Sequence, residues 1–446
     1  MKRRHVVVVG GGFSGVLLSI HLLERGAWVT LIERADRLAR GVAYSTAHPD
    51  HLLNVRASGM SAFPDRPDHF ANWLQGEVEG EAQSFARRRT YGAYVGSLLD
   101  DARVQAVERM AIVRAEVLNV TPGETGEIVQ LAGGARIEAD AVVLALGNLP
   151  SEMPRVIAAA GLPDGVYEDD PWSPSVAVGL GPDDGVLLIG TGLTAIDAAL
   201  LLDSAGFSGR ILALSRRGLL PRAHADAPFT VPVLDAEPEP RCTALARLVR
   251  VRAEQLGWRA AVDSLRPVTQ SLWARASVAE RRRFLRHLRP WWDVHRHRIA
   301  PSIARRLDEM VAAGRLQLAA GRIVSVHAEG DAAALRWRAR GEAGEQALTV
   351  RRIVNCTGPQ ADIARAREPV LDALIAAGRV RADACRIGID VDAHCRAIGA
   401  AGEPSPSLLA VGPITKSAFW EVVAVPDIRS QVRDVAQTLA GQPGPR

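Results

Sequence analysis

Two glycine-rich segments of this 446-residue chain have the spacing that binds the pyrophosphate of a dinucleotide. The first reads Gly10-Gly11-Gly12-Phe13-Ser14-Gly15, and the second reads Gly190-Thr191-Gly192-Leu193-Thr194-Ala195. In this fingerprint the first glycine makes a tight turn, the second lets the backbone approach the pyrophosphate, and the third position, Gly or Ala, lets a helix pack closely. Two such sites in one chain predict an enzyme that passes a hydride from a nicotinamide to a flavin.

The elements that must position the first segment follow in order along the sequence. Residues 6–9 predict a buried parallel strand, residues 16–23 an apolar helix, and residues 28–32 a second strand. Glu33 closes that strand at the spacing of an acid that accepts a hydrogen bond from a ribose hydroxyl, and we include its neighbour Arg34 in the same site. Because all these parts arrive in register, we interpret this segment as a site for FAD.

The second segment differs at the end of its next strand. Residues 210–214 predict that strand, and it ends in Ser215-Arg216-Arg217 instead of an acid. A carboxylate would repel a 2′-phosphate, whereas a hydroxyl and two guanidinium groups would hold one, so we expect NADPH here, with NADH possible. All but two of the 54 basic residues are arginine, so an ordinary surface role for the pair stays open.

Composition narrows the class of protein. A net charge of +4 on 446 residues indicates neither a nucleic-acid nor a membrane partner, and no run approaches the ~20 apolar residues of a membrane span. The basic start precedes an apolar run too short for a signal peptide, so we expect a cytoplasmic protein. The four cysteines include no CxxC pair, which argues against a close-spaced redox disulfide, and Cys356 is expected to be a small buried apolar residue.

A repeated strand-then-glycine pattern sets the expected domain organisation. Strands ending near Gly147 and Gly358 each follow a fingerprint and a polar stretch, and a further strand precedes Gly412. We expect an α/β fold of two Rossmann-like domains, with the NAD(P)H domain inserted in the FAD domain. The expected parts are residues 1–170 and 350–446 for FAD and residues 171–349 for NAD(P)H, the latter with a helical insertion at 241–314 that Pro290 interrupts.

The chain also resembles a known family over essentially its whole length. The segments that carry the resemblance are Gly41-Val42-Ala43-Tyr44, His51-Leu52-Leu53-Asn54-Val55, Phe70-Ala71-Asn72-Trp73-Leu74, Ser215-Arg216-Arg217-Gly218-Leu219-Leu220-Pro221, Leu288-Arg289-Pro290-Trp291-Trp292-Asp293-Val294-His295-Arg296-His297-Arg298, Phe419-Trp420-Glu421 and Ala424-Val425-Pro426-Asp427-Ile428-Arg429. They are similar to FAD/NAD(P)-binding proteins grouped with a flavin-dependent urate hydroxylase and an aspartate N-monooxygenase. The resemblance implies a monooxygenase that takes a small polar or anionic substrate and molecular oxygen and acts through a flavin C4a-hydroperoxide.

The resemblance also implies candidate site residues, each with an alternative. Asn54 is expected beside the reacting edge of the flavin, or else it is a turn residue that satisfies its own backbone. Trp420 is a second catalytic candidate, and Glu421 lies next to it. Arg88, Tyr91 and Tyr94 are further candidates beside the flavin or substrate, and core packing is the alternative for the two tyrosines. Arg289 or Arg296 is a candidate to hold an anion from the insertion, which is otherwise a packing element. His295 and His297 lie two apart on a helix and do not suggest a metal site.

Two other classes of function stay open on the sequence. One is a flavin-dependent reductase or dehydrogenase with another electron acceptor, and the other is a redox-sensing protein that keeps both nucleotides as ligands. The last helix, expected from Pro426 to about residue 439, would aim its positive end at the flavin ring. Neither the substrate nor the oligomeric state can be predicted from these patterns.

Overall fold

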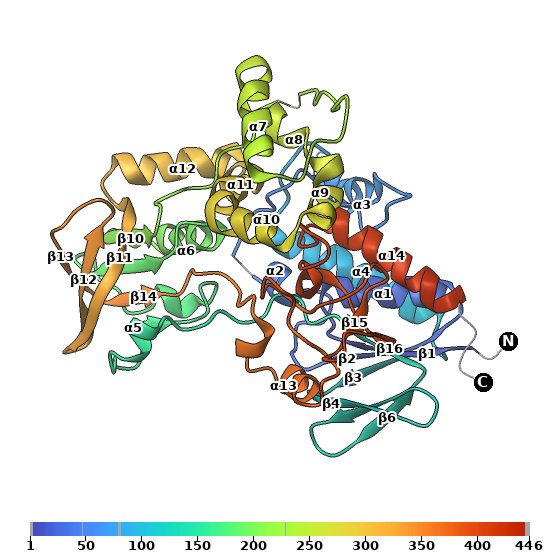
Figure 1. The fold of residues 1–446 in the computed structure, drawn as a ribbon. Helices are drawn as coiled ribbons and strands as arrows, with labels where there is room; N and C mark the ends of the chain where they lie inside the picture. Colours follow the sequence, from blue (N-terminus) through green and yellow to red (C-terminus); the bar gives the residue numbers. More distant parts are fainter. Residues whose placement is uncertain (1–2, 47, 79–81, 228, 442–446) are drawn as a thin grey trace.

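The computed structural model describes residues 3–46, 48–78, 82–227 and 229–441, and its strands form three sheets (Figure 1). The first sheet has the order β15 (Arg396–Ile398), β16 (Pro404–Ala410), β7 (Ala141–Leu144), β1 (His5–Val9), β2 (Trp28–Glu33) and β3 (Met110–Arg114). All neighbours in it are parallel except β15 and β16. The carboxyl ends of β1, β7 and β16 therefore meet at one edge.

The apolar run of β1 is buried on both faces, as a central parallel strand requires. Val6 and Val8 face the core that contains α1 (Phe13–Glu24), α4 (Arg88–Gln105) and α14 (Val425–Gly441). Val7 and Val9 face the opposite core, which contains α13 (Pro369–Ala376) and the small sheet β4 (Val117–Pro122), β5 (Glu127–Leu131) and β6 (Arg136–Ala139). The strand–turn–helix–strand sequence predicted for the first site is confirmed.

The second sheet repeats the plan with an antiparallel extension. Its order is β13 (Gln346–Val350), β12 (Ala332–Ala339), β11 (Leu316–Glu329), β10 (Arg210–Ser215), β9 (Gly185–Ile189), β14 (Arg352–Val354) and β8 (Tyr167–Glu168). From β11 to β8 the pairs are parallel, whereas β11, β12 and β13 pair antiparallel. The helices α6 (Leu193–Ser204) and α12 (Pro301–Ala312) contribute to the core on one face.

The strands of the second sheet all lie between two parts of the first sheet in the sequence. This confirms the expected fold class, in which one dinucleotide-binding unit is inserted in another. The division into residues 1–170, 171–349 and 350–446 stays a prediction. The short strands β8 and β14, which lie near its boundaries, both pair in the second sheet.

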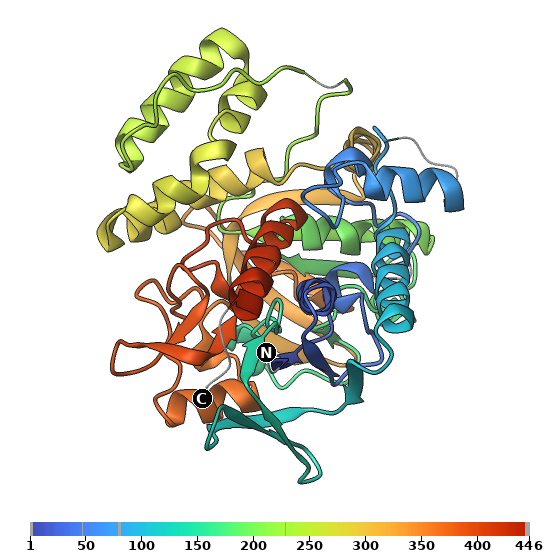
Figure 2. The same ribbon diagram turned by 90° about the vertical axis from the view of Figure 1, so that its right-hand side faces the viewer.

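A group of helices stands above the two sheets, at the top of Figure 1 and at the upper left of Figure 2. They are α7 (Cys242–Leu256), α8 (Trp258–Asp263), α9 (Thr269–Arg275), α10 (Val278–Arg283) and α11 (Arg289–Arg296). A π-helical segment, Phe284–Leu288, joins α10 to α11, whose second residue is Pro290. The remaining short helices are α2 (Gly41–Tyr44), α3 (His69–Val78) and α5 (Arg155–Ala158). No helix in the described part of the chain is both long and apolar enough to cross a membrane.

Candidate functional site

The first glycine loop has the geometry that its fingerprint predicts. Gly10 has a φ of +109°, which favours glycine, and a Cβ there would overlap the carbonyl oxygen of Ala145. A Cβ at Gly15 would overlap the Gly10 carbonyl oxygen, so α1 packs directly against the loop. At Gly12 the nearest atom to a Cβ would be Gly41 Cα at 3.6 Å. Packing therefore requires the outer two glycines, and Gly12 leaves room at the face where a ligand would approach.

The second loop follows the same geometry at β9. Gly190 has a φ of +133°, and a Cβ there would overlap the Cys356 carbonyl oxygen. A Cβ at Gly192 would meet nothing within 4 Å, and the residue is exposed. Ala195 is 3% exposed in the core beneath α6, and Thr194 is partly exposed in the first turn. The open position thus again lies between two packed ones.

Both loops lead into helices whose N-termini are free of side-chain caps. Gly12 and Gly192 are the N-cap residues of the 12-residue helices α1 and α6, and no side chain in the described part of the chain caps either helix. An uncapped N-terminus presents unsatisfied N–H groups and a positive partial charge to an anion. The residues present therefore fit a pyrophosphate at each loop, which is what FAD and a nicotinamide dinucleotide would bring.

Glu33 and Arg34 are already engaged by protein groups. Glu33 accepts hydrogen bonds from the backbone N–H groups of Gly11 (2.7 Å) and Ala35 (2.8 Å). Arg34 forms two hydrogen bonds with Glu368 (2.8 and 2.9 Å) and one with Glu116 (3.1 Å). Glu33, at the end of β2, thus supports the first glycine loop. Arg34 joins the same strand end to Glu368, which directly precedes α13. Their contacts with a cofactor stay a prediction.

The three residues at the end of β10 that are expected to bind a 2′-phosphate have different environments. Ser215 Oγ accepts a hydrogen bond from the Gly218 N–H (2.9 Å) and lies 2.8 Å from Thr191 Oγ1, which joins the loop to this turn. Arg216 is exposed, and within the described residues it makes no hydrogen bond or ion pair. Arg217 instead donates to two carbonyl groups of the helical insertion. Of the two arginines, Arg216 is therefore the unengaged one at this strand end.

The glycines that follow the other strands lie at the same sheet edges. Gly147 follows β7, Gly412 follows β16, and Gly358 follows β14 in the second sheet. A Cβ built at Gly412 would come within 3.1 Å of Ser14 Cβ, so this glycine lies directly against the first loop. A small pocket here is lined by residues that include Gly147, Gln360 and Lys416. Burial lowers the pKa of the Lys416 ammonium to about 8, with Arg289 acting in the same direction.

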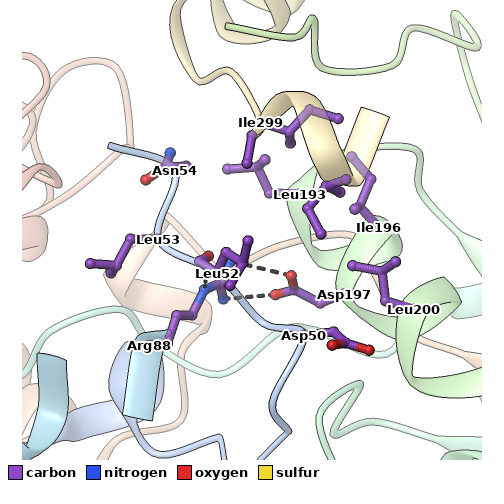
Figure 3. Close-up of a pocket in the computed structure, with 12 residues that line it drawn as sticks. Asp50, Leu52, Leu53, Asn54, Arg88, Leu193, Ile196, Asp197, Leu200 and Ile299 are labelled. Atoms are coloured by element: carbon purple, nitrogen blue, oxygen red, sulfur yellow. Dashed lines mark hydrogen bonds and ion pairs between the residues drawn. The ribbon is translucent and has the colours of Figure 1, made fainter. Parts of the chain in front are cut away.

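Asn54 lines a second pocket, at the seam between the two units (Figure 3). The Leu52–Asn54 segment forms one side, and α6 forms the other with Leu193, Ile196 and Leu200. The Asn54 carbonyl oxygen lies 2.9 Å from His224 Nε2, so its backbone is engaged across the seam. The contact of the Asn54 side chain with the flavin stays a prediction.

Asp197 of α6 is the centre of a buried polar cluster beside this pocket. Its carboxylate pairs with Arg88 of α4 (2.7 Å) and accepts a hydrogen bond from Trp172 Nε1 (2.9 Å). Its backbone oxygen lies 3.0 Å from Nε2 of His51, whose other ring nitrogen lies 2.7 Å from Thr46 Oγ1. Asp197, His51, Arg88 and Trp172 come from four segments, so the cluster fixes the inserted unit against the first one.

The sequence did not lead us to Asp197, although a signal exists. It stands as the one charged residue within the apolar run of residues 193–202. A charged side chain that a helix places in the core requires a partner of opposite charge. The partner of Asp197 is Arg88, which the resemblance had placed beside the flavin or substrate.

Tyr91 and Tyr94 are core residues of α4. Both are 0% exposed, and their rings pack with Phe70 and with each other, at centroid distances of 4.9 and 5.6 Å. Burial raises the pKa of Tyr94 to about 12 and also raises the pKa of Tyr91, so both hydroxyl groups stay protonated. Core packing, the alternative interpretation, describes their position.

Trp420 packs in an aromatic cluster that joins the insertion to the segment after β16 of the first sheet. Its ring stacks on Trp273 of α9 (4.5 Å between centroids, 26° between planes) and lies edge-on to Phe284. The next residue, Glu421, has a φ of +69°, accepts hydrogen bonds from Trp292 Nε1 (2.7 Å) and Arg296 Nε (3.1 Å), and is buried. Arg296 is thus paired inside the protein. A catalytic role for Trp420 stays a prediction.

Asp427 and Arg266, which lie beside this cluster, form a longer and less complete ion pair. Asp427, in the first turn of α14, has a buried Oδ2 without a hydrogen-bond partner, and Arg266 is 3.8 Å from it. Burial raises the pKa of the Asp427 carboxyl. The positive end of α14, which the sequence suggested would face the flavin, therefore carries a carboxyl group of its own.

The cysteines bear on redox chemistry. Cys242, Cys356, Cys385 and Cys395 are all free thiols. Cys356 packs in the core of the second unit, and burial raises its pKa well above the usual range, so it is unreactive as a nucleophile. Its expected role as a small apolar residue matches this environment.

Comparison with known proteins agrees with this architecture. Residues 7–149 match the model of a family described as FAD-NAD(P)-binding. A curated relative, a probable UDP-galactopyranose mutase from Klebsiella pneumoniae, is 35% identical over 63 residues, and this match spans 14% of the chain and 16% of the relative.

Solved structures match over nearly the whole chain. They include an L-lysine 6-monooxygenase from Pseudomonas syringae (TM-score 0.67, covering 99% of this chain and 100% of that one) and an ornithine hydroxylase from Pseudomonas aeruginosa (0.66, 98% and 99%). An ornithine N-hydroxylase from Kutzneria sp. 744, whose structure is described with reduced FAD, NADP⁺ and L-ornithine, gives 0.62, with 98% and 99% covered. Each is 16% identical to this chain. The fold is therefore that of flavoproteins with two dinucleotide-binding units.

Proposed function

We propose that this chain is an FAD- and NADPH-dependent monooxygenase that hydroxylates an amino group of a small polar molecule. The observation that carries the proposal is the pair of glycine loops, each open at its middle glycine and each followed by an uncapped helix. Two pyrophosphate sites at the edges of two sheets suit a flavin and a nicotinamide dinucleotide bound together.

The similarity to lysine and ornithine hydroxylases over the whole chain supports N-hydroxylation in particular. When bound, the flavin would accept a hydride from NADPH and activate molecular oxygen, so that one oxygen atom enters the product and the other leaves as water. The loops would hold the two pyrophosphates, and Arg216 the 2′-phosphate. Asn54, Gly147, Gly358 and Gly412 would border the cofactors, and a cytoplasmic location fits the free thiols.

The helical insertion would keep water from the region between the two units. It packs on the segment after Gly412 through Trp273 and Trp420, and on Glu421 through Arg296. An aromatic and ion-paired contact of this kind would limit unproductive reaction of the reduced flavin with solvent.

The direct test follows NADPH oxidation by the FAD-loaded protein under ¹⁸O₂ with lysine, ornithine, aspartate or urate. We expect one of the amines to raise NADPH consumption and to gain one ¹⁸O atom, which mass spectrometry of the product detects. Oxidation of NADPH with every oxygen atom recovered as hydrogen peroxide or water, whatever the substrate, would instead support a flavin reductase. No oxidation of NADPH at all would support a protein that only binds the two nucleotides.

A further inference from the structure

Arg216 and Arg217, neighbours in the sequence, have different environments. The Arg217 guanidinium donates to the carbonyl oxygens of Arg286 (3.1 Å) and His287 (3.4 Å), both in the π-helical segment of the insertion. Arg216 is exposed, and no other described residue engages it. Among the described residues, the strand end thus offers one cation without a partner, Arg216, and one that is already bound, Arg217.

Pro290 explains why the Arg286 carbonyl is available to Arg217. In a continuous helix the carbonyl of Arg286 would accept from the N–H four residues later, and at that place Pro290 has none. The helix widens to a π-turn over Phe284–Leu288 and resumes as α11. Arg217 therefore supplies a donor that the insertion's own backbone lacks. Its charge also suits the carbonyl end of the preceding helix.

A tight turn directs Arg217 toward the insertion. Ser215 Oγ accepts from the Gly218 N–H, and Gly218 has a φ of +61°. A Cβ at Gly218 would come within 2.9 Å of the Ala320 backbone nitrogen, so the turn fits closely on β11. Because Ser215 also lies against Thr191 of the second glycine loop, the loop, the turn and Arg217 form one connected unit.

The other end of the insertion reaches the flavin unit. Trp273 stacks on Trp420, and Arg296 and Trp292 hold Glu421. The contacts of Arg217 therefore complete a bridge from the strand β10 to the segment that follows Gly412.

We infer that the two arginines have separate tasks: Arg216 recognises the 2′-phosphate, whereas Arg217 is a positioning residue that anchors the helical insertion on the nucleotide unit. The first half rests on the proposed NADPH site. The second half rests on contacts within the chain and stands whichever nucleotide binds.

The test compares Arg216→Ala, Arg217→Ala and Arg217→Lys in the FAD-loaded protein. For Arg216→Ala we expect the KM for NADPH to rise about tenfold or more, with the KM for NADH unchanged, since a charge-assisted contact is lost. For Arg217→Ala we expect the ratio of the two KM values to stay as in the wild type and kcat to fall. Backbone hydrogen exchange in residues 278–296 should accelerate by about fivefold. Arg217→Lys keeps a donor and should restore most of the protection.

Three other outcomes would change the roles assigned to Arg216 and Arg217. A selective rise in the NADPH KM for Arg217→Ala, with exchange in residues 278–296 unchanged, would make Arg217 a phosphate ligand and overturn the inference. Unchanged exchange together with unchanged kinetics would also overturn it. If Arg216→Ala left the NADPH preference intact while Arg217→Ala still loosened the insertion, the NADPH assignment would fail and the anchoring role would hold.

Discussion

At the scale of single residues, burial decides which candidate groups remain available for chemistry. Tyr91, Tyr94 and Cys356 are buried with raised pKa values, and Arg88 and Arg296 are paired with carboxylates. Among the described residues Arg216 has no partner, a Cβ at Gly192 would meet nothing within 4 Å, and a Cβ at Gly12 would meet only Gly41, at 3.6 Å or more. Arg216, Gly12 and Gly192 are therefore the candidates for contact with a ligand.

His51 predicts how stability depends on pH. Burial holds the pKa of its ring below the usual value, and the nearby Arg88 and His48 act in the same direction against Asp197. His51 therefore binds a proton more readily in the unfolded chain than in the folded one. Its contribution to the free energy of unfolding is complete above the unfolded pKa of about 6.5 and is lost as the pH falls below that value.

Replacing His51 with Gln removes this proton uptake. We expect the free energy of unfolding of His51→Gln, measured in urea, to fall less between about pH 7.5 and about pH 5 than that of the wild type, by up to about 1.4 kcal/mol per pH unit. His394→Gln, at an exposed position, is the control and should follow the wild-type slope. Identical slopes for all three proteins would show that His51 does not resist protonation.

At the scale of elements, an ion pair joins α4 to α6. Arg88 and Asp197 are 15% and 6% exposed, so removal of one partner leaves a buried charge. We expect Asp197→Ala to lower the free energy of unfolding by about 3 kcal/mol or more, as urea unfolding would measure.

The matched control is an exposed pair in the same helix α4. Asp100 and Arg103 are 73% and 56% exposed, and Asp100→Ala should cost less than about 1 kcal/mol. Equal effects of the two substitutions would mean that the Asp197 cluster does not hold the units together.

The elements of both dinucleotide units could be predicted from the sequence because their signals are local. An apolar strand, a glycine turn and an apolar helix lie within about 25 residues at each site. The residue pairs that were not predicted join residues that lie far apart in the sequence. Arg34 meets Glu368, 334 residues away, and Arg217 donates to the Arg286 carbonyl, 69 residues away, to which Pro290 has no N–H to donate. No residue spacing indicates such pairs, so the sequence assigned Arg216 and Arg217 one shared role although their environments differ.

At the scale of the whole molecule, the two units face each other across a seam that is closed at several points. The Asp197 cluster holds one side, and the insertion bridges another from Arg217 to Trp420. This arrangement suits the transfer of a hydride between two bound nucleotides in a fixed geometry. The central claim is accordingly that each glycine loop holds its own dinucleotide.

Substitution of the middle glycine tests that claim, because the backbone tolerates it. Gly12 and Gly192 have φ near −80° and ψ near −170°, an extended conformation that any residue adopts, and Gly192 faces open space. Valine at either position should fold while it blocks the ligand. Gly344→Val, at an exposed loop position where a Cβ meets nothing within 4 Å, is the control.

The measurement is the absorbance of bound flavin in the purified proteins, before and after anaerobic addition of NADPH. We predict that the wild type and Gly344→Val carry FAD that NADPH bleaches. Gly192→Val should carry FAD that dithionite bleaches and NADPH does not, and Gly12→Val should be isolated without flavin. Equal loss of FAD in the Gly12 and Gly192 variants, or undiminished bleaching by NADPH in Gly192→Val, would contradict the claim.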